Sequence, residues 1–137
     1  MFSEQNKILA RRFYDEILNS RKMDVADEIL STQYVDHSAS APGLENFKQY
    51  LAMITSVFPD IQVTVEDLVA DENKVAVRLT VSGTQHGSFR GFPGTGRPAS
   101  WTGMDLISVS SGKITERWSE RDFLSMLLQL GHVQYPQ

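Results

Sequence analysis

The first sixty residues carry apolar side chains at helical spacing. Between residues 3 and 20 they recur three or four positions apart, which predicts an amphipathic helix with one wide apolar face. The same spacing predicts a short helix over 23–31 and a third helix over 44–57. Pro59 ends the third helix, because the residue before a proline avoids the helical conformation. A short strand or turn at 33–37 lies between these last two helices.

From residue 61 the apolar period changes from helical to alternating. Ile61, Val63 and Val65 alternate with polar residues, and the apolar residues of 75–81 do the same. This alternation is typical of strands with one buried face, and 71–73 has turn composition. The same reasoning predicts the remaining elements, which are strands at about 100–109 and 113–121, a tight turn at 110–112 and a short helix or turn at 122–130.

Three helices followed by an antiparallel meander predict an α+β fold, with residues 1–137 forming one domain. We expect a curved antiparallel sheet wrapped around the N-terminal helices, a cone with an internal pocket. The short strand near Tyr34 would add to the edge of the sheet. A cavity between the sheet and the helices is a natural place for a small ligand.

The composition argues against several classes of function. The 137 residues contain no cysteine and have a formal net charge of −4. Without cysteine there are no thiol nucleophiles and no thiolate metal sites, and the acidic balance argues against nucleic acid as a partner. The apolar runs are far shorter than the roughly 20 residues that span a membrane. The polar N-terminus lacks the apolar core of a signal peptide, which favours a cytoplasmic protein.

A glycine-rich segment precedes the third predicted strand. Residues Gly94 to Ala99 match the spacing of a dinucleotide-binding fingerprint, but that motif must open a helix, and here a strand follows. We therefore expect a rigid hairpin at the mouth of a pocket and no bound cofactor. The histidines His37, His86 and His132 are scattered, so no metal site is predicted.

The last predicted strand suggests a catalytic carboxylate. Alternation along 114–122 places Trp118 and Asp122 on the same side as Ile114. If that side faces the interior, Asp122 lies beside Trp118 in apolar surroundings. Loss of hydration there raises the pKa of a carboxyl group, which suits it to proton transfer. The alternative is that Asp122 caps the final helix, and a cap lowers the pKa instead.

Asp105 is a second candidate carboxylate. It shares the parity of Trp101 on the preceding strand, so strand pairing could bring it near Trp118 or Glu120. The two aspartates would then form an acid/base pair. An exposed aspartate in the middle of a strand is the alternative.

Several segments, in order and spacing, resemble the SnoaL-like polyketide (ester) cyclases. The resemblance covers residues 6 to 131 approximately. It rests on Tyr34-Val35-Asp36-His37, on the segment from Gly83 to Gly96, on Gly112 to Trp118, on Asp122-Phe123 and on Gln129-Leu130-Gly131. The resemblance implies the cone-shaped fold shared with nuclear transport factor 2 and ketosteroid isomerase. It also implies cofactor-free ring closure by intramolecular aldol condensation on an aromatic polyketide ester.

The resemblance also assigns residues. An aspartate near the end of the last strand is the general acid/base of the characterised cyclases, and Asp122 matches it. Two departures from the family pattern concern the polar lining of the pocket. Gln85 occupies a position where those cyclases tend to have histidine, with His86 one residue along, and Asp105 replaces a pocket histidine. The polar lining is therefore expected to differ from theirs.

The leading hypothesis is a cofactor-independent enzyme acting on a small, apolar carbonyl compound, with Asp122 and Asp105 catalytic. The expected pocket walls are Phe92, Trp101, Met104, Trp118 and Met126, and the expected hydrogen-bond donors to substrate oxygens are Tyr14, Tyr34 and His37. One alternative is an isomerase, dehydratase or epoxide hydrolase on the same fold. The other is a non-catalytic ligand-binding module. We expect a homodimer or homotetramer, with the outer sheet face, which carries Thr64, Arg78, Thr80 and Ser82, as a surface that pairs subunits.

Overall fold

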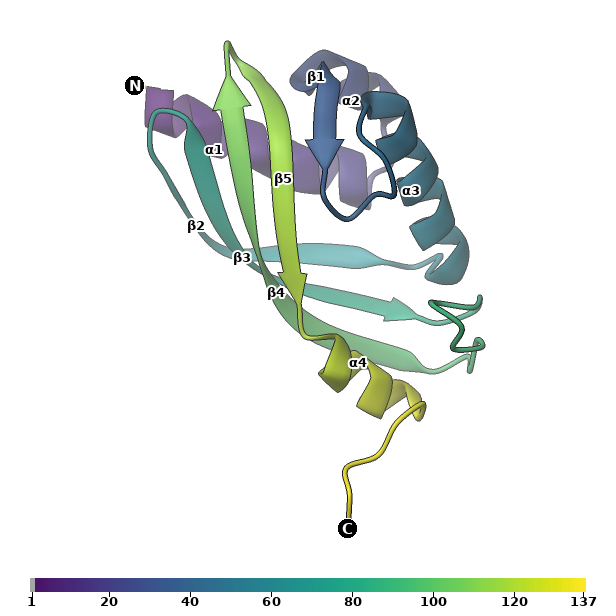
Figure 1. The fold of residues 1–137 in the computed structure, drawn as a ribbon. Coiled ribbons are helices and arrows are strands. Elements are labelled where there is room, and N and C mark those ends of the chain that lie inside the picture. Colours follow the sequence, from purple (N-terminus) through teal and green to yellow (C-terminus); the bar gives the residue numbers. More distant parts are fainter. Residues whose placement is uncertain (1) are drawn as a thin grey trace.

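A strongly curved sheet dominates the computed structural model, which describes residues 2–137 (Figure 1). The elements in chain order are α1 (Phe2–Arg12), η1 (Phe13–Asn19), α2 (Met23–Ile29), β1 (Leu30–Asp36), α3 (Leu44–Val57), β2 (Gln62–Ala70), β3 (Lys74–Thr84), β4 (Pro98–Ser110), β5 (Lys113–Arg121) and α4 (Phe123–Leu130). The fold is α+β, as the sequence pattern predicts. The predicted helix over 3–20 is α1 together with η1, a π-helical segment that continues it.

The strands form one sheet in the order β1-β5-β4-β3-β2. Strands β2 to β5 are an antiparallel meander, in which β3 and β4 pair along almost their whole length. The short strand β1 pairs with β5 in parallel at the edge. The expectation that the short strand near Tyr34 extends the sheet is therefore confirmed.

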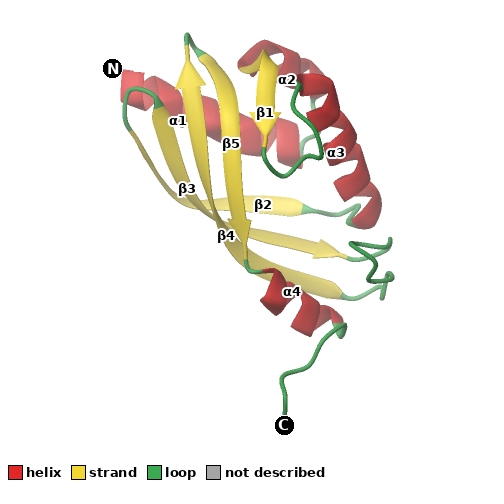
Figure 2. Ribbon diagram, in the orientation of Figure 1, coloured by secondary structure: helices red, strands yellow, loops and turns green. Residues whose placement is uncertain are grey.

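The helices cover the concave side of the sheet and leave one end of it open. Figure 2 shows α1 crossing the sheet, α2 and α3 flanking β1, and α4 leaving the end of β5. Phe13, Tyr14 and Ile17 of η1 are fully buried in the core. At the start of α1, the Asn6 side chain donates hydrogen bonds to the carbonyl oxygens of Asp71 and Glu72, which anchors the helix to the β2–β3 turn.

A β-bulge changes the faces of β5. Val109 of β4 pairs with Ile114, but Ser108 pairs with Glu116, so Thr115 is an extra residue. An inserted residue reverses the alternation of every position after it. Ile114 and Arg117 consequently both face the interior. The expectation that Trp118 follows Ile114 onto the concave face is wrong, and Trp118 lies 37% exposed on the outer face.

None of the helices within residues 2–137 is long and apolar enough to cross a membrane.

Candidate functional site

A cavity of about 230 Å³ opens between the concave face of the sheet, α3 and α4. Its apolar lining is Leu18, Leu51, Ile54, Phe58, Ile61, Val63, Val81, Phe89, Trp101, Phe123 and Met126. Its polar lining is His37, Ser38, Tyr50, Thr55, Arg90, Arg117, Ser119 and Arg121. Since an apolar cavity of about 150 Å³ can hold benzene, this one has room for a small ring system. Apolar walls with a few convergent polar groups are typical of small-molecule sites.

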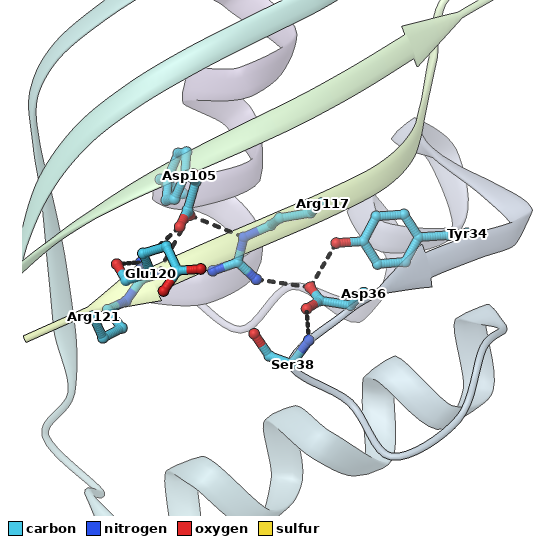
Figure 3. Close-up of polar contacts among 8 residues, drawn as sticks. Tyr34, Asp36, Ser38, Asp105, Arg117, Glu120 and Arg121 are labelled. Atoms are coloured by element: carbon cyan, nitrogen blue, oxygen red, sulfur yellow. Dashed lines mark hydrogen bonds and ion pairs between the residues drawn. The ribbon is translucent and has the colours of Figure 1, made fainter. Parts of the chain in front are cut away.

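The polar end of the cavity rests on a buried network of ion pairs (Figure 3). Asp105 accepts hydrogen bonds from Arg117 Nε at 2.9 Å and from Arg121 Nη1 at 2.6 Å. Arg117 Nη1 donates to Asp36 Oδ2 at 2.7 Å. The network therefore alternates acid and base across three strands, β1, β5 and β4. Two aspartates offset two arginines, so its formal charge is zero.

Two buried tyrosines complete the network from behind. The Tyr14 hydroxyl donates to Asp105 Oδ2 at 2.5 Å, and the Tyr34 hydroxyl donates to Asp36 Oδ2 at 2.7 Å. Both tyrosines are fully buried, and neither lines the cavity. Their hydroxyl protons are directed to carboxylates of the protein. The structure thus places both outside the cavity where the sequence analysis expected them to meet a substrate.

The network fixes the charge of its members. Burial alone raises the pKa of Asp105, but Arg117 and Arg121 outweigh it and hold that pKa well below its usual range. Burial alone lowers the pKa of Arg117, but Asp105 and Asp36 outweigh it and raise that pKa. Asp105 is therefore an ionised structural anion. It is poorly suited to the acid/base exchange for which the sequence analysis nominated it.

Hydrogen-bond donors remain free on the cavity side of β5. Ser119 lies between Arg117 and Arg121 on the same face, and its Oγ is buried without a hydrogen-bond partner among the described residues. Across the cavity, burial raises the pKa of Tyr50, so its hydroxyl keeps its proton. Developing negative charge on a bound oxygen would be stabilised by such donors.

His37 lies where β1 ends beside β5, and it lines the cavity. Its ring stacks on Trp118 with centroids 4.9 Å apart, and its Nε2 is 2.6 Å from Glu116 Oε2. Because a carboxylate accepts, Nε2 carries the hydrogen and Nδ1 is left as the acceptor of the neutral ring. Trp118 and Glu116 lie on the outer face of β5, so the His37 ring lies on that side too, although His37 is one of the residues that border the cavity. Among the described residues at this border, only His37 has a ring nitrogen that can accept a proton, and the ring would have to turn away from Trp118 to reach a ligand in the cavity.

Asp122 lies at the start of α4 and not on the concave face. Its side chain is exposed and accepts a hydrogen bond from the backbone N–H of Ser125 at 3.0 Å, as an N-cap does. It is not part of the cavity lining. The expected position beside Trp118 in an apolar pocket is therefore wrong, because the bulge in β5 reverses the faces. Its catalytic role stays a prediction.

The expected pocket walls divide into two groups. Trp101 and Met126 line the cavity as predicted, and both are buried. Met104 lies on the outer face of the sheet with 55% of its surface exposed. Phe92 is half-buried in the glycine-rich hairpin, where its ring packs against His132 with centroids 5.0 Å apart. Met104, Phe92 and Trp118 are thus outside the cavity lining.

The glycine-rich hairpin forms part of the rim, as expected. The fully buried Gln85 side chain donates to the carbonyl oxygens of Gly87 and Phe92, and its Oε1 lies 2.6 Å from His132 Nε2. A Cβ atom at Gly94 would lie 2.3 Å from the carbonyl oxygen of His86, so only glycine fits there. These contacts hold the hairpin in place, with Phe89 and Arg90 at the cavity mouth.

No group of three or more histidine, aspartate or glutamate residues in the described part of the chain could hold a metal ion.

The comparison with family models covers most of the chain. The model of the SnoaL-like polyketide cyclases matches residues 8–130. This chain belongs to the SnoaL-like polyketide cyclase family. A search of curated proteins finds no match to this chain. The predicted resemblance and its fold are thereby confirmed.

Solved structures of SnoaL-like relatives share the fold over almost the whole chain. TsrD from Streptomyces laurentii is 27% identical with a TM-score of 0.86, covering 95% of this chain and 97% of its own. Wild-type IdmH from Streptomyces antibioticus is 30% identical with a TM-score of 0.80, covering 91% and 97%. AclR from Streptomyces galilaeus is 25% identical with a TM-score of 0.81, covering 98% and 89%. The latter two carry proposed assignments, IdmH as a polyketide cyclase and AclR as a hydroxylase.

The sequence pattern did not predict the main polar residues of this site. Arg117, Ser119 and Arg121 alternate on one strand, so they share a face by period two, but arginine is usually exposed and gave no signal of burial. A usable signal was the pair of aspartates at 36 and 105. Each lies on a strand with buried apolar residues, and a buried carboxylate requires a positive partner.

Proposed function

We propose that this protein catalyses proton transfer at a carbon next to a carbonyl group of a small, apolar substrate, with cyclase-type ring closure as its reaction. The observation that carries the proposal is the apolar cavity with hydrogen-bond donors at one end and His37 at its border. His37 would take the proton once its ring turns from Trp118 toward the cavity, since it alone among the described residues that border the cavity is suited to accept one. Family membership supports the reaction class.

The donors have a defined part in this chemistry. When a carbon next to a carbonyl loses its proton, negative charge develops on the carbonyl oxygen. Ser119 Oγ and Tyr50 have hydroxyl protons to offer that oxygen, and the guanidinium groups of Arg117 and Arg121 add a fixed positive potential. Glu116 would stabilise His37 when the ring is protonated, because its carboxylate lies 2.6 Å from Nε2. In ring closure the carbon that lost its proton forms a bond to a second carbonyl carbon of the same substrate, and the oxygen of that carbonyl takes up the proton from His37. The step therefore needs proton transfer and charge stabilisation only, which side chains can supply.

Hydrogen exchange tests the proposal without knowledge of the natural substrate. The probe is 2-tetralone, a bicyclic aromatic ketone with acidic protons next to its carbonyl group. In D₂O, we expect the protein to accelerate loss of these proton signals over a protein-free blank, with saturation at high ketone concentration. Proton NMR follows the exchange. Failure of 2-tetralone to bind in the cavity would contradict the proposed substrate class.

A ligand-binding module is the second candidate function. It is favoured by the cap role of Asp122 and by the complete engagement of Asp105 with Arg117 and Arg121. Under this alternative, 2-tetralone binds in the cavity and its exchange rate equals that of the blank. The same experiment therefore separates the two functions.

We also propose that a second copy of the chain covers the outer face of the sheet. Met104 and Leu106 are exposed there in the middle of the sheet. Cross-strand pairing places Met104 between Arg78 and Glu120, so a positive and a negative side chain flank the apolar centre. A two-fold partner reverses this row, which brings Arg78 of one copy opposite Glu120 of the other.

Charged substitutions test this interface. The double variant Met104→Glu, Leu106→Glu should raise the dimer dissociation constant at least about tenfold, because it buries carboxylates at the centre of the contact. Sedimentation velocity over a concentration series measures the change. The control is Leu124→Glu, a substitution at an exposed leucine of α4 outside the outer face. A wild-type chain that stays monomeric, or a double variant that dimerises like it, contradicts the proposal.

A further inference from the structure

The charges around the cavity are unequal in sign. Arg90, Arg117 and Arg121 belong to its lining, and the described lining contains no aspartate or glutamate. Asp36 and Asp105 offset Arg117 and Arg121 from behind. Arg90 has no such partner, since none of the ion pairs between described residues includes it. The cavity therefore has an excess positive charge at its mouth.

Arg90 is held at this mouth by aromatic rings. Its guanidinium carbon lies 5.3 Å from the ring centroid of Phe89 and 5.0 Å from that of Phe123. Both rings line the cavity. Cation–π contacts of this kind orient a guanidinium group without neutralising its charge. Arg90 is exposed, so it remains free to meet an incoming ligand.

The floor of the cavity has a hydroxyl group without a partner beside two guanidinium groups. Ser119 Oγ is buried and unpartnered among the described residues. Arg117 uses Nε and Nη1 for its carboxylate partners, and Arg121 uses both terminal nitrogens for Asp105. A buried polar atom without a partner costs free energy, and a ligand oxygen that accepts from it removes that cost. The bound group should therefore hydrogen-bond Ser119, whose hydroxyl can donate or accept, and the unpaired positive charge of Arg90 favours an anionic acceptor.

We propose that the ligand of this cavity is an anion, a flat apolar molecule with one carboxylate, phenolate or enolate oxygen that accepts a hydrogen bond from Ser119, with the unpaired positive charge of Arg90 at the mouth. The inference rests on the proposed function in using the same cavity, and it specifies the class of substrate. Arg90 attracts the anion at the mouth. The apolar walls, Trp101 among them, contact the ring system.

A pair of isosteric probes separates charge from shape. At pH 7.5, 2-naphthoate is an anion and 2-naphthamide is neutral, with the same ring and nearly the same outline. Titration calorimetry should give a dissociation constant for naphthoate about tenfold or more below that for naphthamide. The chain has two tryptophans, so the amide spectrum shows two indole signals, and a shift of the Trp101 signal locates the ligand in the cavity.

Two variants then assign the anion to named residues. Ser119→Ala removes a hydroxyl that makes no bond within the described structure, so the fold should be unaffected while naphthoate affinity falls about tenfold. Arg90→Gln should weaken naphthoate binding about two- to fivefold, with a smaller loss at high salt. Naphthamide affinity should barely change in Arg90→Gln and should fall less than naphthoate affinity in Ser119→Ala, because a hydrogen bond to a neutral oxygen is weaker than one to a charged oxygen. Ser82→Ala, at an exposed serine on the outer face of β3, is the matched control.

The outcomes distinguish this inference from the proposed function. Equal binding of the two probes, with the Trp101 signal shifted, overturns the anion preference and leaves the cavity as a ligand site. Unchanged naphthoate affinity in Ser119→Ala overturns the assignment of that hydroxyl. If neither probe moves the Trp101 signal, the cavity is not a site for flat apolar ligands, and the proposed function fails as well.

Discussion

Replacing Asp105 by asparagine should lower the free energy of unfolding by about 3–5 kcal/mol. The substitution keeps the shape of the side chain but removes the charge that offsets Arg117 and Arg121. It also sets an amide N–H₂ group against donors, because Tyr14, Arg117 and Arg121 all donate to this carboxylate. Urea denaturation at pH 7, followed by far-ultraviolet circular dichroism, measures the change.

The pH dependence of stability gives a second measurement on the same variant. The arginines hold the folded-state pKa of Asp105 well below its unfolded value of about 3.9, although burial alone would raise it. The resulting stabilisation is fully present above the unfolded pKa and is lost as pH falls through the folded pKa. Wild-type stability should therefore decline more steeply below about pH 4 than that of Asp105→Asn.

Asp122→Asn is the matched control, since it makes the same chemical change at an exposed position. Asparagine caps helices about as well as aspartate, so stability should change by less than about 0.5 kcal/mol. Equal, small effects of the two substitutions would mean that the buried network contributes little, and the account of Asp105 as a structural anion would be wrong.

The fold was accessible from the sequence because each element has a strong local pattern. Alternation in β3 and helical spacing in α3 each depend on neighbouring residues, and burial follows both patterns closely. The residue range predicted for the last strand agrees with β5. The position of β1 at the edge of the sheet was predictable, because a short strand that follows a helix has few strands to pair with other than an edge strand.

The site was less accessible because one residue changed its geometry. Thr115 is bulged, and this single insertion moves Arg117, Ser119 and Arg121 to the interior and Trp118 to the surface. A bulge depends on the pairing register between strands, and period-two reasoning assumes that none occurs. The error for Asp122 follows from the same cause.

Long-range pairing also lies outside the reach of local patterns. Arg117 meets Asp36 across 81 positions of the chain, and Tyr14 meets Asp105 across 91. An interior Asp105 was one of two possibilities open from the sequence, and the structure selects it. Local sequence patterns could not identify the distant partners that make this aspartate a structural anion.

His37→Gln should slow the protein-dependent exchange of 2-tetralone by about 10²–10⁴-fold. Glutamine is close in size and can still hydrogen-bond Glu116, but it cannot accept a proton at neutral pH. Glu116→Gln should give a rate between those of the wild type and His37→Gln, because the ring remains but loses the carboxylate that stabilises its protonated form. Proton NMR in D₂O measures each rate, and titration with 2-tetralone confirms that the variants still bind it.

The controls separate a catalytic histidine from a structural one. His86→Gln changes an exposed histidine that does not line the cavity, so its exchange rate should equal that of the wild type. Glu116 acts through His37, so its loss should change the pH dependence of exchange as well as the rate, which a purely structural role would not do. Asp122→Asn tests the competing assignment, in which Asp122 is the base. If it abolishes exchange while His37→Gln leaves the rate intact, the carboxylate at the start of α4 is the base and the assignment of His37 is overturned.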